Sequence, residues 1–441
     1  MTREMEFLVR NGLDVGAIDR EKLLAVFAEE MDAGLAGRES SLRMIPSFIS
    51  IDRPVRTDTP VVVLDAGGTN LRAAVVTIGA DGKADIGAFA KQPMPGTQGE
   101  LSAEAFFEAF AEFLMPVVGA ADTIGFCFSY AAEILPDCDA RLIKWSKQIQ
   151  VPAVEGQLIG TGLKERLARR GLQRRIVILN DTVATLLAGK SAGVTKNYSA
   201  YVGFILGTGT NTAYVEQNAR ITKRSDLNLD EAMVINVESG GFRRIEQTAF
   251  DQQMDAQTLD CGYYTFEKMI SGAYLGNIGF IVLKEAVKEG LFSKGAASVI
   301  GAWDALSNKH LDDFCGDSPL LKGGAGVSDG GGLSNPFLDA AFTPEDHEAV
   351  RRLCTPVYER AAVLTAVNLA SAILKTGEGK DPMRPVCVNV DGSTYYRTLT
   401  ADFQNRVQRE LASLLQPRGI AYELIKVDDS PVIGAAVAGL V

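Results

Sequence analysis

Two glycine-rich turns stand out in this sequence, because each lies between two apolar runs and contains threonine and asparagine. The first is Asp65-Ala66-Gly67-Gly68-Thr69-Asn70, and the second is Gly207-Thr208-Gly209-Thr210-Asn211. Glycine permits positive φ and allows backbone N–H groups to approach an anion closely, while the polar side chains add donors. Arg72 adds a positive charge after the first turn. Either turn alone could belong to an ordinary hairpin, but the repetition favours two turns that clamp a polyphosphate.

A third polar cluster, Asn180-Asp181-Thr182, follows the apolar run 176–179 and precedes a helical pattern. One interpretation is helix capping, since these residue types accept hydrogen bonds from the free N–H groups of a first turn. The other is a general base that a strand end directs into a cleft. Asp181 could serve one purpose and Asn180 or Thr182 the other, and the pattern alone leaves both open.

Further polar residues follow predicted strands or begin predicted helices, where α/β proteins place ligand contacts. Two of the candidates below also have an ordinary explanation. Lys147 could be a solvated charge, and Glu267 could simply stabilise the N-terminus of a helix by its negative charge. No Walker-A lysine pattern occurs, and the second turn lacks the third glycine and following helix of a dinucleotide-binding motif. The candidates are Ser129, the Ser146-Lys147 pair behind Trp145, Glu238, Glu267, and the turn Asp391-Gly392-Ser393.

Strands and helices alternate along the chain, which indicates an α/β protein with two related halves, each opened by a hairpin. We expect hairpins over 61–76 and 201–216, and an exposed glycine-dense insertion over 322–334. The expected helices are 19–35, 103–118, 156–170, 183–190, 266–287, 347–374, 402–415 and 432–440, and the further strands are 86–89, 123–129, 176–179, 235–237, 386–390 and 421–427.

Length and composition restrict the function. A chain of 441 residues is too long for one ordinary core, so two domains are expected. The net charge of −11 argues against non-specific nucleic-acid binding. Six scattered cysteines and two histidines indicate reduced thiols and no zinc cluster. Residues 1–12 lack an apolar signal core, and we judge no apolar run long enough to span a bilayer. We expect a cytoplasmic protein without a membrane partner.

Taken together, these stretches resemble the hexokinase family, ATP-dependent sugar kinases of the actin-like fold. The similar motifs occur in the same order from about Leu24 to the C-terminus. They are MIPSF from Met44, LDAGGTNLR, GFCFS, KWSK, NDTVATLLA, LGTGTN, INVESGGF, FEKMISGAYLG and VDGSTY. The chain departs from the family pattern at Tyr130-Ala131, where Phe-Pro is usual, at Ser239, where Trp is usual, and over 429–433.

The resemblance implies two actin-like (ribonuclease H-like) domains, each a mixed five-stranded sheet flanked by helices, with a cleft between them. Residues 1–54 would form a helical segment packed on the large domain. Residues 55–181, with the C-terminal helix 430–441, would form the small domain, and residues 182–429 the large domain. The enzyme would bind a hexose and MgATP and act as a monomer or homodimer.

The resemblance also implies a role for each candidate residue. Asp181 would be the general base, with Lys147 and Arg72 as further catalytic residues. Hexose would contact Ser129, Ser146, Lys147, Asn180, Asp181, Asn211, Glu238 and Glu267; ATP would contact Asp65, Gly67, Gly68, Thr69, Asn70, Arg72, Gly207, Thr208, Gly209, Gly392 and Ser393; and Mg²⁺ would lie near Asp65 and Asp181, through water. Glucose is the expected substrate. Another sugar, another phosphoryl donor, or a sugar-sensing protein without turnover are the alternatives.

Overall fold

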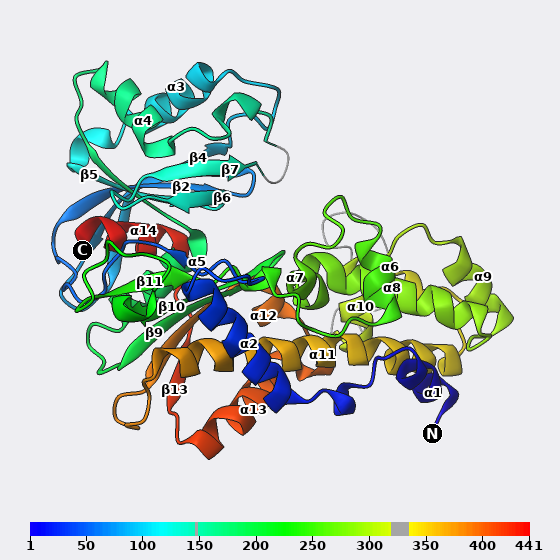
Figure 1. Ribbon diagram of the computed structural model, residues 1–441. Helices are drawn as coiled ribbons and strands as arrows, with labels where there is room; N and C mark the ends of the chain where they lie inside the picture. Colours follow the sequence, from blue (N-terminus) through cyan, green and yellow to red (C-terminus); the bar gives the residue numbers. More distant parts are fainter. Residues whose placement is uncertain (146–148, 319–334) are drawn as a thin grey trace.

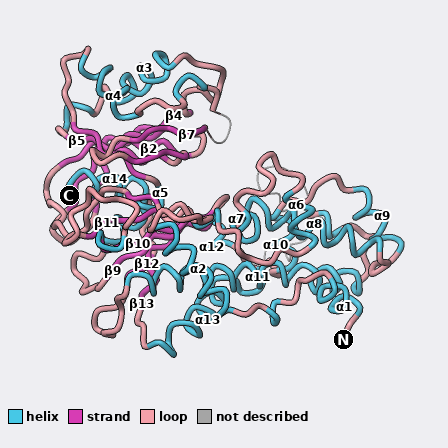
Figure 2. Tube along the Cα trace, viewed as in Figure 1, coloured by secondary structure: helices cyan, strands magenta, loops and turns pink. Residues whose placement is uncertain are grey.

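The computed structural model describes residues 1–145, 149–318 and 335–441 (Figure 1). The predictions at Ser146, Lys147 and residues 322–334 therefore lie outside the described residues. Two mixed sheets with flanking helices form the framework, which confirms the α/β fold class (Figure 2). The first sheet has the order β4-β3-β2-β5-β8. Its strands are β2 (Pro60–Gly67), β3 (Asn70–Ile78), β4 (Ala84–Pro93), β5 (Thr123–Phe128) and β8 (Arg175–Leu179).

The second sheet repeats this arrangement and adds one strand. Its order is β1-β11-β10-β9-β12-β13. In both sheets an antiparallel hairpin is joined to two parallel strands that follow later in the chain. Five strands were expected; the sixth, β1, is a two-residue strand that pairs Ile45 with Asn236. The strands are β1 (Ile45–Pro46), β9 (Ala200–Leu206), β10 (Thr210–Gln217), β11 (Ala232–Asn236), β12 (Val386–Asp391) and β13 (Tyr422–Ile425).

Two helices, α5 (Asp181–Ala192) and α14 (Ser430–Leu440), lie between the sheets (Figure 1). Helix α14 is built from small apolar residues because its backbone packs directly on both neighbours. A Cβ at Gly434 would lie 1.9 Å from the carbonyl oxygen of Ala184, and a Cβ at Gly125 would lie 1.9 Å from that of Ala435. Only glycine fits at such contacts, so these two positions set the separation between α14, α5 and β5.

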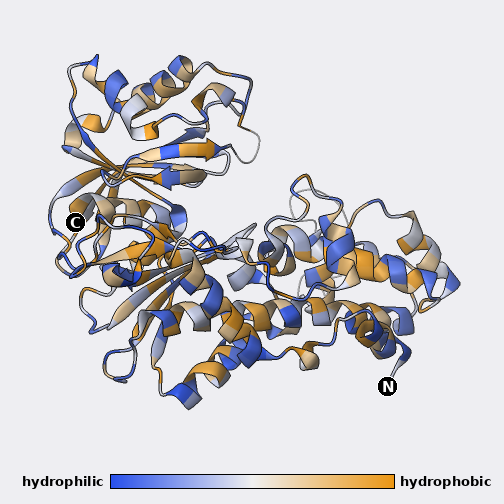
Figure 3. Ribbon diagram, viewed as in Figure 1, coloured by the Kyte–Doolittle hydropathy of each residue, from blue (hydrophilic) through white to orange (hydrophobic). Residues whose placement is uncertain are grey.

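Helices cover the outer faces of both sheets, and the surface helices carry a hydrophilic and a hydrophobic side (Figure 3). On the first sheet, α3 (Ala103–Leu114) contributes the buried stripe of Phe106, Phe107 and Phe110, beside α4 (Ile159–Ala168). On the second sheet lie α11 (Pro344–Thr376) and α12 (Ser393–Arg397), and α2 (Arg20–Leu35) and α13 (Phe403–Leu415) pack on α11.

Helix α11 corrects our expectation that no apolar segment reaches the length of a membrane span. In the described residues it is the one helix that is long and apolar enough, but 89% of the relevant window is buried inside the protein. The helix begins with a capping box between Thr343 and Asp346, with Pro344 in the first turn. Residues 361–373 of this helix are all buried, which explains why this part is mostly apolar, so α11 is a core helix.

The region predicted as one helix over 266–287 is two helices, α7 (Thr265–Ile270) and α8 (Gly272–Lys288). Ser271 is extended, and the N–H of Gly272 donates to the carbonyl oxygen of Gly207 at 2.9 Å. The break therefore exists because α8 begins against the second glycine-rich turn. Other elements were not predicted: α1 (Arg3–Arg10), the hairpin of β6 (Ala131–Ile134) and β7 (Ala140–Lys144), α6 (Ala249–Asp255), α9 (Lys294–Ala302) and α10 (Asn308–Cys315).

Candidate active site

A cavity of about 610 Å³ is lined by residues from both sheets and their connections. Residues that follow β5 form one wall, and the turn between β9 and β10 forms the opposite one. Ile45 and Ser47, at and beside the short strand β1, complete the wall next to β11. Eight predicted site residues lie in this lining: Ser129, Asn180, Asp181, Thr208, Gly209, Asn211, Glu238 and Glu267.

In the cluster 180–182, one residue caps the helix and a different residue is available for the acid–base role. Asn180 is the N-cap of α5, and its side-chain oxygen accepts from the N–H of Thr182 at 2.9 Å. Asp181 is the first residue of the helix and lies in the cavity wall. Its Oδ1 accepts from the Thr182 hydroxyl at 3.3 Å. Asn180 thus caps the helix, and the carboxylate of Asp181 is placed beside the cavity.

Glu238 is held by two asparagine side chains. Its Oε1 accepts from Asn211 at 3.0 Å and from Asn236 at 2.9 Å. The residue adopts a left-handed conformation with φ 59° and ψ 46°, which directs it out of the strand β11. Burial raises the pKa of Glu238, while the bond from Asn236 and the charge of Arg43 oppose that effect. The sequence analysis missed Asn236, although a polar residue at the end of an apolar strand could have indicated it.

Glu267 lies against the second glycine-rich turn. Its Oε2 accepts from the N–H of Thr210 at 2.9 Å. Burial raises the pKa of Glu267 to about 7, and the negative charges of Glu238 and Asp260 add to the effect. A Cβ at Gly209 would lie 2.5 Å from Oε2 of Glu267, so glycine is required there by the approach of this carboxylate.

The predicted nucleotide-binding residues lie mostly outside the cavity lining. Gly68 has φ +62° with open space around its Cβ position, and its carbonyl oxygen accepts from the Tyr130 hydroxyl at 2.8 Å. The second turn contacts the turn after β12, because the Thr394 hydroxyl donates to the carbonyl oxygen of Gly207 at 2.8 Å. The residues outside the lining are Asp65, Gly67, Gly68, Thr69, Asn70, Arg72, Gly207, Gly392 and Ser393.

Arg72 and Asp65 form an ion pair at the base of the first turn, with 2.8 Å between Nε and Oδ2. The side chain of Asp65 is 1% exposed. Burial raises the pKa of Asp65; the charge of Arg72 opposes this, and the charge of Asp181 adds to it. Arg72, expected on the transferred phosphoryl group, is therefore oriented by Asp65 in this structure. Several cavity residues had not been singled out: Arg43, Asn236, Asp260, Tyr264 and Tyr274.

Comparisons with known proteins identify the family. Family models described as hexokinase match residues 10–191 and 201–441. The hexokinase of Schistosoma mansoni is 28% identical over 440 residues, covering 96% of this chain and 94% of that protein. Hexokinase-2 of Oryza sativa subsp. japonica is 31% identical over 433 residues, covering 93% and 85%. The chain belongs to the hexokinase family. The resemblance drawn from the motifs is confirmed, and the chain is an ATP-dependent hexose kinase.

A solved structure agrees over the whole chain. The structure of hexokinase from Schistosoma mansoni complexed with glucose matches with a TM-score of 0.78 at 27% identity, covering 99% of this chain and 98% of that one. The two-sheet architecture is therefore that of an actin-like hexokinase, as the motif order implied.

Proposed function

We propose that this hexokinase-family enzyme transfers the γ-phosphoryl group of MgATP to the 6-hydroxyl of a hexose. Glucose is the proposed substrate, and the reaction would be the first step of glycolysis. The main support is that Asp181 shares one cavity with Glu238 and Glu267. The related Schistosoma mansoni hexokinase was solved in complex with glucose.

The hexose would occupy the cavity, where fixed donors and acceptors meet its hydroxyl groups. Each sugar hydroxyl both donates and accepts, so an unmatched polar group in the cavity would weaken binding. The amide of Asn211 is already oriented, since its Oδ1 accepts from the N–H of Thr212 at 2.7 Å. The proposed hexose ligands are Ser129, Asn180, Asp181, Asn211, Glu238 and Glu267, together with Ser146 and Lys147, which lie outside the described residues.

Asp181 would act as the general base that takes the proton of the 6-hydroxyl while its oxygen attacks the γ-phosphorus. Lys147 and Arg72 would balance negative charge on the transferred group. Arg72 suits this role because its ion pair with Asp65 fixes the guanidinium at the end of the first turn. Closure of the small and large domains over the sugar would exclude water and limit hydrolysis of ATP.

The phosphates of ATP would lie along the turns 65–70 and 207–209, with Gly392 and Ser393 on the adenosine side. When bound, Mg²⁺ neutralises charge on the β- and γ-phosphates. The residues present fit such an ion: Oδ1 of the buried Asp65 has no hydrogen-bond partner among the described residues, Oδ2 pairs with Arg72, and the charge of Asp181 lies close by. Asp65 and Asp181 would hold the hydrated ion through water.

The test is Asp181→Ala, compared with Asp304→Ala at an exposed position outside the cavity lining. General bases contribute on the order of 10² to 10⁴ in rate, so kcat should fall by at least about 10² while calorimetry still detects hexose binding. Near-normal turnover of Asp181→Ala would refute the role of this residue. Failure of the unmodified enzyme to phosphorylate any hexose would refute the function itself.

A panel of sugars tests which one is the preferred substrate. Tyr130, Ala131 and Ser239 replace residues that are usual in the family, and Tyr130 and Ala131 line the cavity. A kinase of mannose, fructose or glucosamine is therefore the second candidate, and coupled detection of ADP with each sugar would distinguish it from a glucose kinase. The highest kcat/KM for glucose supports the proposal, and a higher value for another sugar replaces it.

We propose a helical segment 1–54, a small domain 55–181 with helix 430–441, and a large domain 182–429. In support, Phe7, Leu24 and Phe27 share one buried core with Val202 and Phe204 of the second sheet. We also propose a cytoplasmic enzyme that is a monomer or homodimer; fractionation and light scattering test these two statements.

A further inference from the structure

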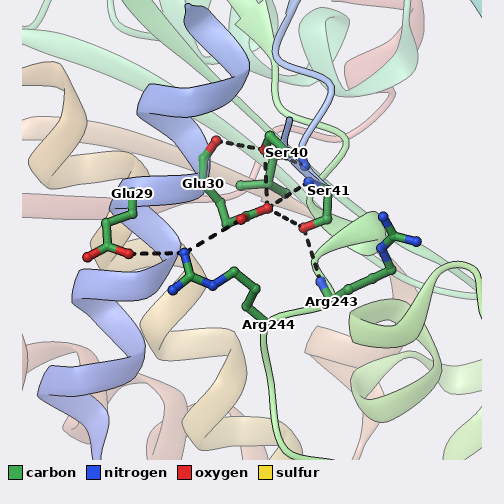
Figure 4. A network of polar contacts seen from close by, with 7 residues as sticks. Glu29, Glu30, Ser40, Ser41, Arg243 and Arg244 are labelled. Carbon is green, nitrogen blue, oxygen red and sulfur yellow. Dashed lines mark hydrogen bonds and ion pairs between the residues drawn. The ribbon is translucent and has the colours of Figure 1, made fainter. Parts of the chain in front are cut away.

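Glu30 is a buried carboxylate on α2 that lies outside the hexose cavity and is not used in the proposed reaction. Its side chain is 9% exposed. Its Oε2 accepts from the N–H and the hydroxyl of Ser41, each at 2.6 Å, and from the hydroxyl of Ser40 at 3.2 Å (Figure 4). Burial raises the pKa of Glu30, but these hydrogen bonds outweigh it and leave the pKa below its ordinary value. Glu30 therefore fixes the beginning of the segment 40–48.

The segment 40–48 borders the cavity, which Arg43, Ile45 and Ser47 line. A second anchor fixes its middle: Nζ of Lys223 donates to the carbonyl oxygens of Arg43 at 2.9 Å and Met44 at 2.6 Å. Strand β1 then pairs with β11. The path between these anchors includes a left-handed residue, Met44, with φ 48°. Such a conformation persists only where surrounding contacts determine it.

The same carboxylate reaches the turn after Glu238. The N–H of Arg243 donates to the Ser41 hydroxyl at 3.2 Å. The guanidinium of Arg244 lies 3.0 Å from Glu29 and 3.7 Å from Glu30, whereas that of Arg243 points away from the network (Figure 4). Gly241 packs on this segment, since a Cβ there would lie 3.0 Å from the carbonyl oxygen of Ser41. Gly240 and Gly241, two and three residues after Glu238, line the cavity with it.

We propose that Glu30 is a positioning residue for hexose binding. Through its hydrogen bonds to Ser41 it keeps Arg43 at a fixed distance from the turn 238–241 in the wall of the cavity. The inference rests on the proposed function, because it assigns the cavity to the hexose. Burial raises the pKa of Glu238, and the charge of Arg43 opposes that rise, so displacement of Arg43 would weaken Glu238 as an ionised acceptor. No contact of this network reaches the turn 65–70 among the described residues, so ATP binding should be unaffected.

The test compares Glu30→Ala with Glu29→Ala, measured with glucose and ATP. Both variants lose a carboxylate beside Arg244, but only the first loses the bonds to Ser40 and Ser41. Glu30→Ala should raise the KM for glucose about tenfold, the effect of losing one charge-assisted hydrogen bond. The KM for ATP and kcat should stay within about twofold, and Glu29→Ala should behave as the unmodified enzyme.

Two milder variants keep the proposal testable if Glu30→Ala does not fold. Glu30→Gln retains an acceptor for Ser41 and should restore most of the glucose affinity, while Ser41→Ala should raise the KM for glucose without Glu30 being changed. An equal rise in the KM for both substrates, or an unchanged KM for glucose in both Glu30→Ala and Ser41→Ala, would overturn it. Inactivity of the unmodified enzyme on hexoses would instead refute the proposed function.

Discussion

Replacing Glu267 by glutamine should make the enzyme more stable and bind hexose less tightly. Burial, with the charges of Glu238 and Asp260, moves the pKa of Glu267 from 4.5 to about 7. The stability that this carboxyl contributes is therefore fully present below pH 4.5 and is lost as the pH rises to about 7. Keeping Glu267 ionised in the folded state costs about 3 kcal/mol at pH 8. A neutral amide of the same size avoids that cost and can still accept from Thr210.

Urea denaturation of the two proteins at pH 5 and pH 8 measures this effect. The difference in the free energy of unfolding between Glu267→Gln and the unmodified enzyme should be small at pH 5 and approach about 3 kcal/mol at pH 8. Glu246→Gln removes an exposed charge and should show no such dependence on pH. In assays the KM for hexose should rise about tenfold or more, because a charged acceptor is lost. Equal stability of both proteins at pH 8 would refute the reasoning.

Two further predictions concern the cavity wall and the layer between the sheets. Asn236→Ala removes one of the two amide donors to Glu238, so the KM for hexose should rise about tenfold in steady-state assays while the KM for ATP is unchanged. Gly434→Ala would place a Cβ 1.9 Å from the backbone of α5 and should lower the free energy of unfolding by about 3 kcal/mol or more in urea titrations. Gly301→Ala, with no atom within 4 Å of the added Cβ, should leave stability unchanged or raise it.

The sequence allowed prediction of the elements whose signals are local. Apolar runs with glycine-rich turns predicted both hairpins, and the cluster at 180–182 correctly indicated a helix start after β8. The same local signals could not show that α8 begins anew at Gly272, because the break depends on a hydrogen bond to Gly207, which lies 65 positions earlier. Nor could they predict β1, since two residues form a strand only beside the edge of β11.

The cavity was predictable in its motifs but not in its supporting contacts. Glu238 and Glu267 follow recognisable patterns and Asn236 ends an apolar strand, whereas Arg43 reaches the cavity through tertiary packing alone. Glu30 is less evident still, because an acidic residue on an amphipathic helix normally faces solvent. Only its burial beside Ser41 shows that it is part of the framework of the cavity. Side chains that only position other residues of the site leave weaker patterns in the sequence than side chains that would contact a ligand.

The two glycine-rich turns, similar in sequence, differ in their surroundings, and this difference indicates a division of tasks. The first turn is open at Gly68 and is anchored by the Asp65–Arg72 ion pair. The second is enclosed: the N–H of Thr210 binds Glu267, and the carbonyl oxygen of Gly207 accepts from Gly272 and Thr394. Any shift of the second turn would therefore move a proposed hexose ligand and the Gly392 turn together. We infer that the second turn couples the hexose side to the nucleotide side through the carboxylate of Glu267, whereas the first turn is linked to the cavity lining through the Tyr130 hydroxyl on Gly68.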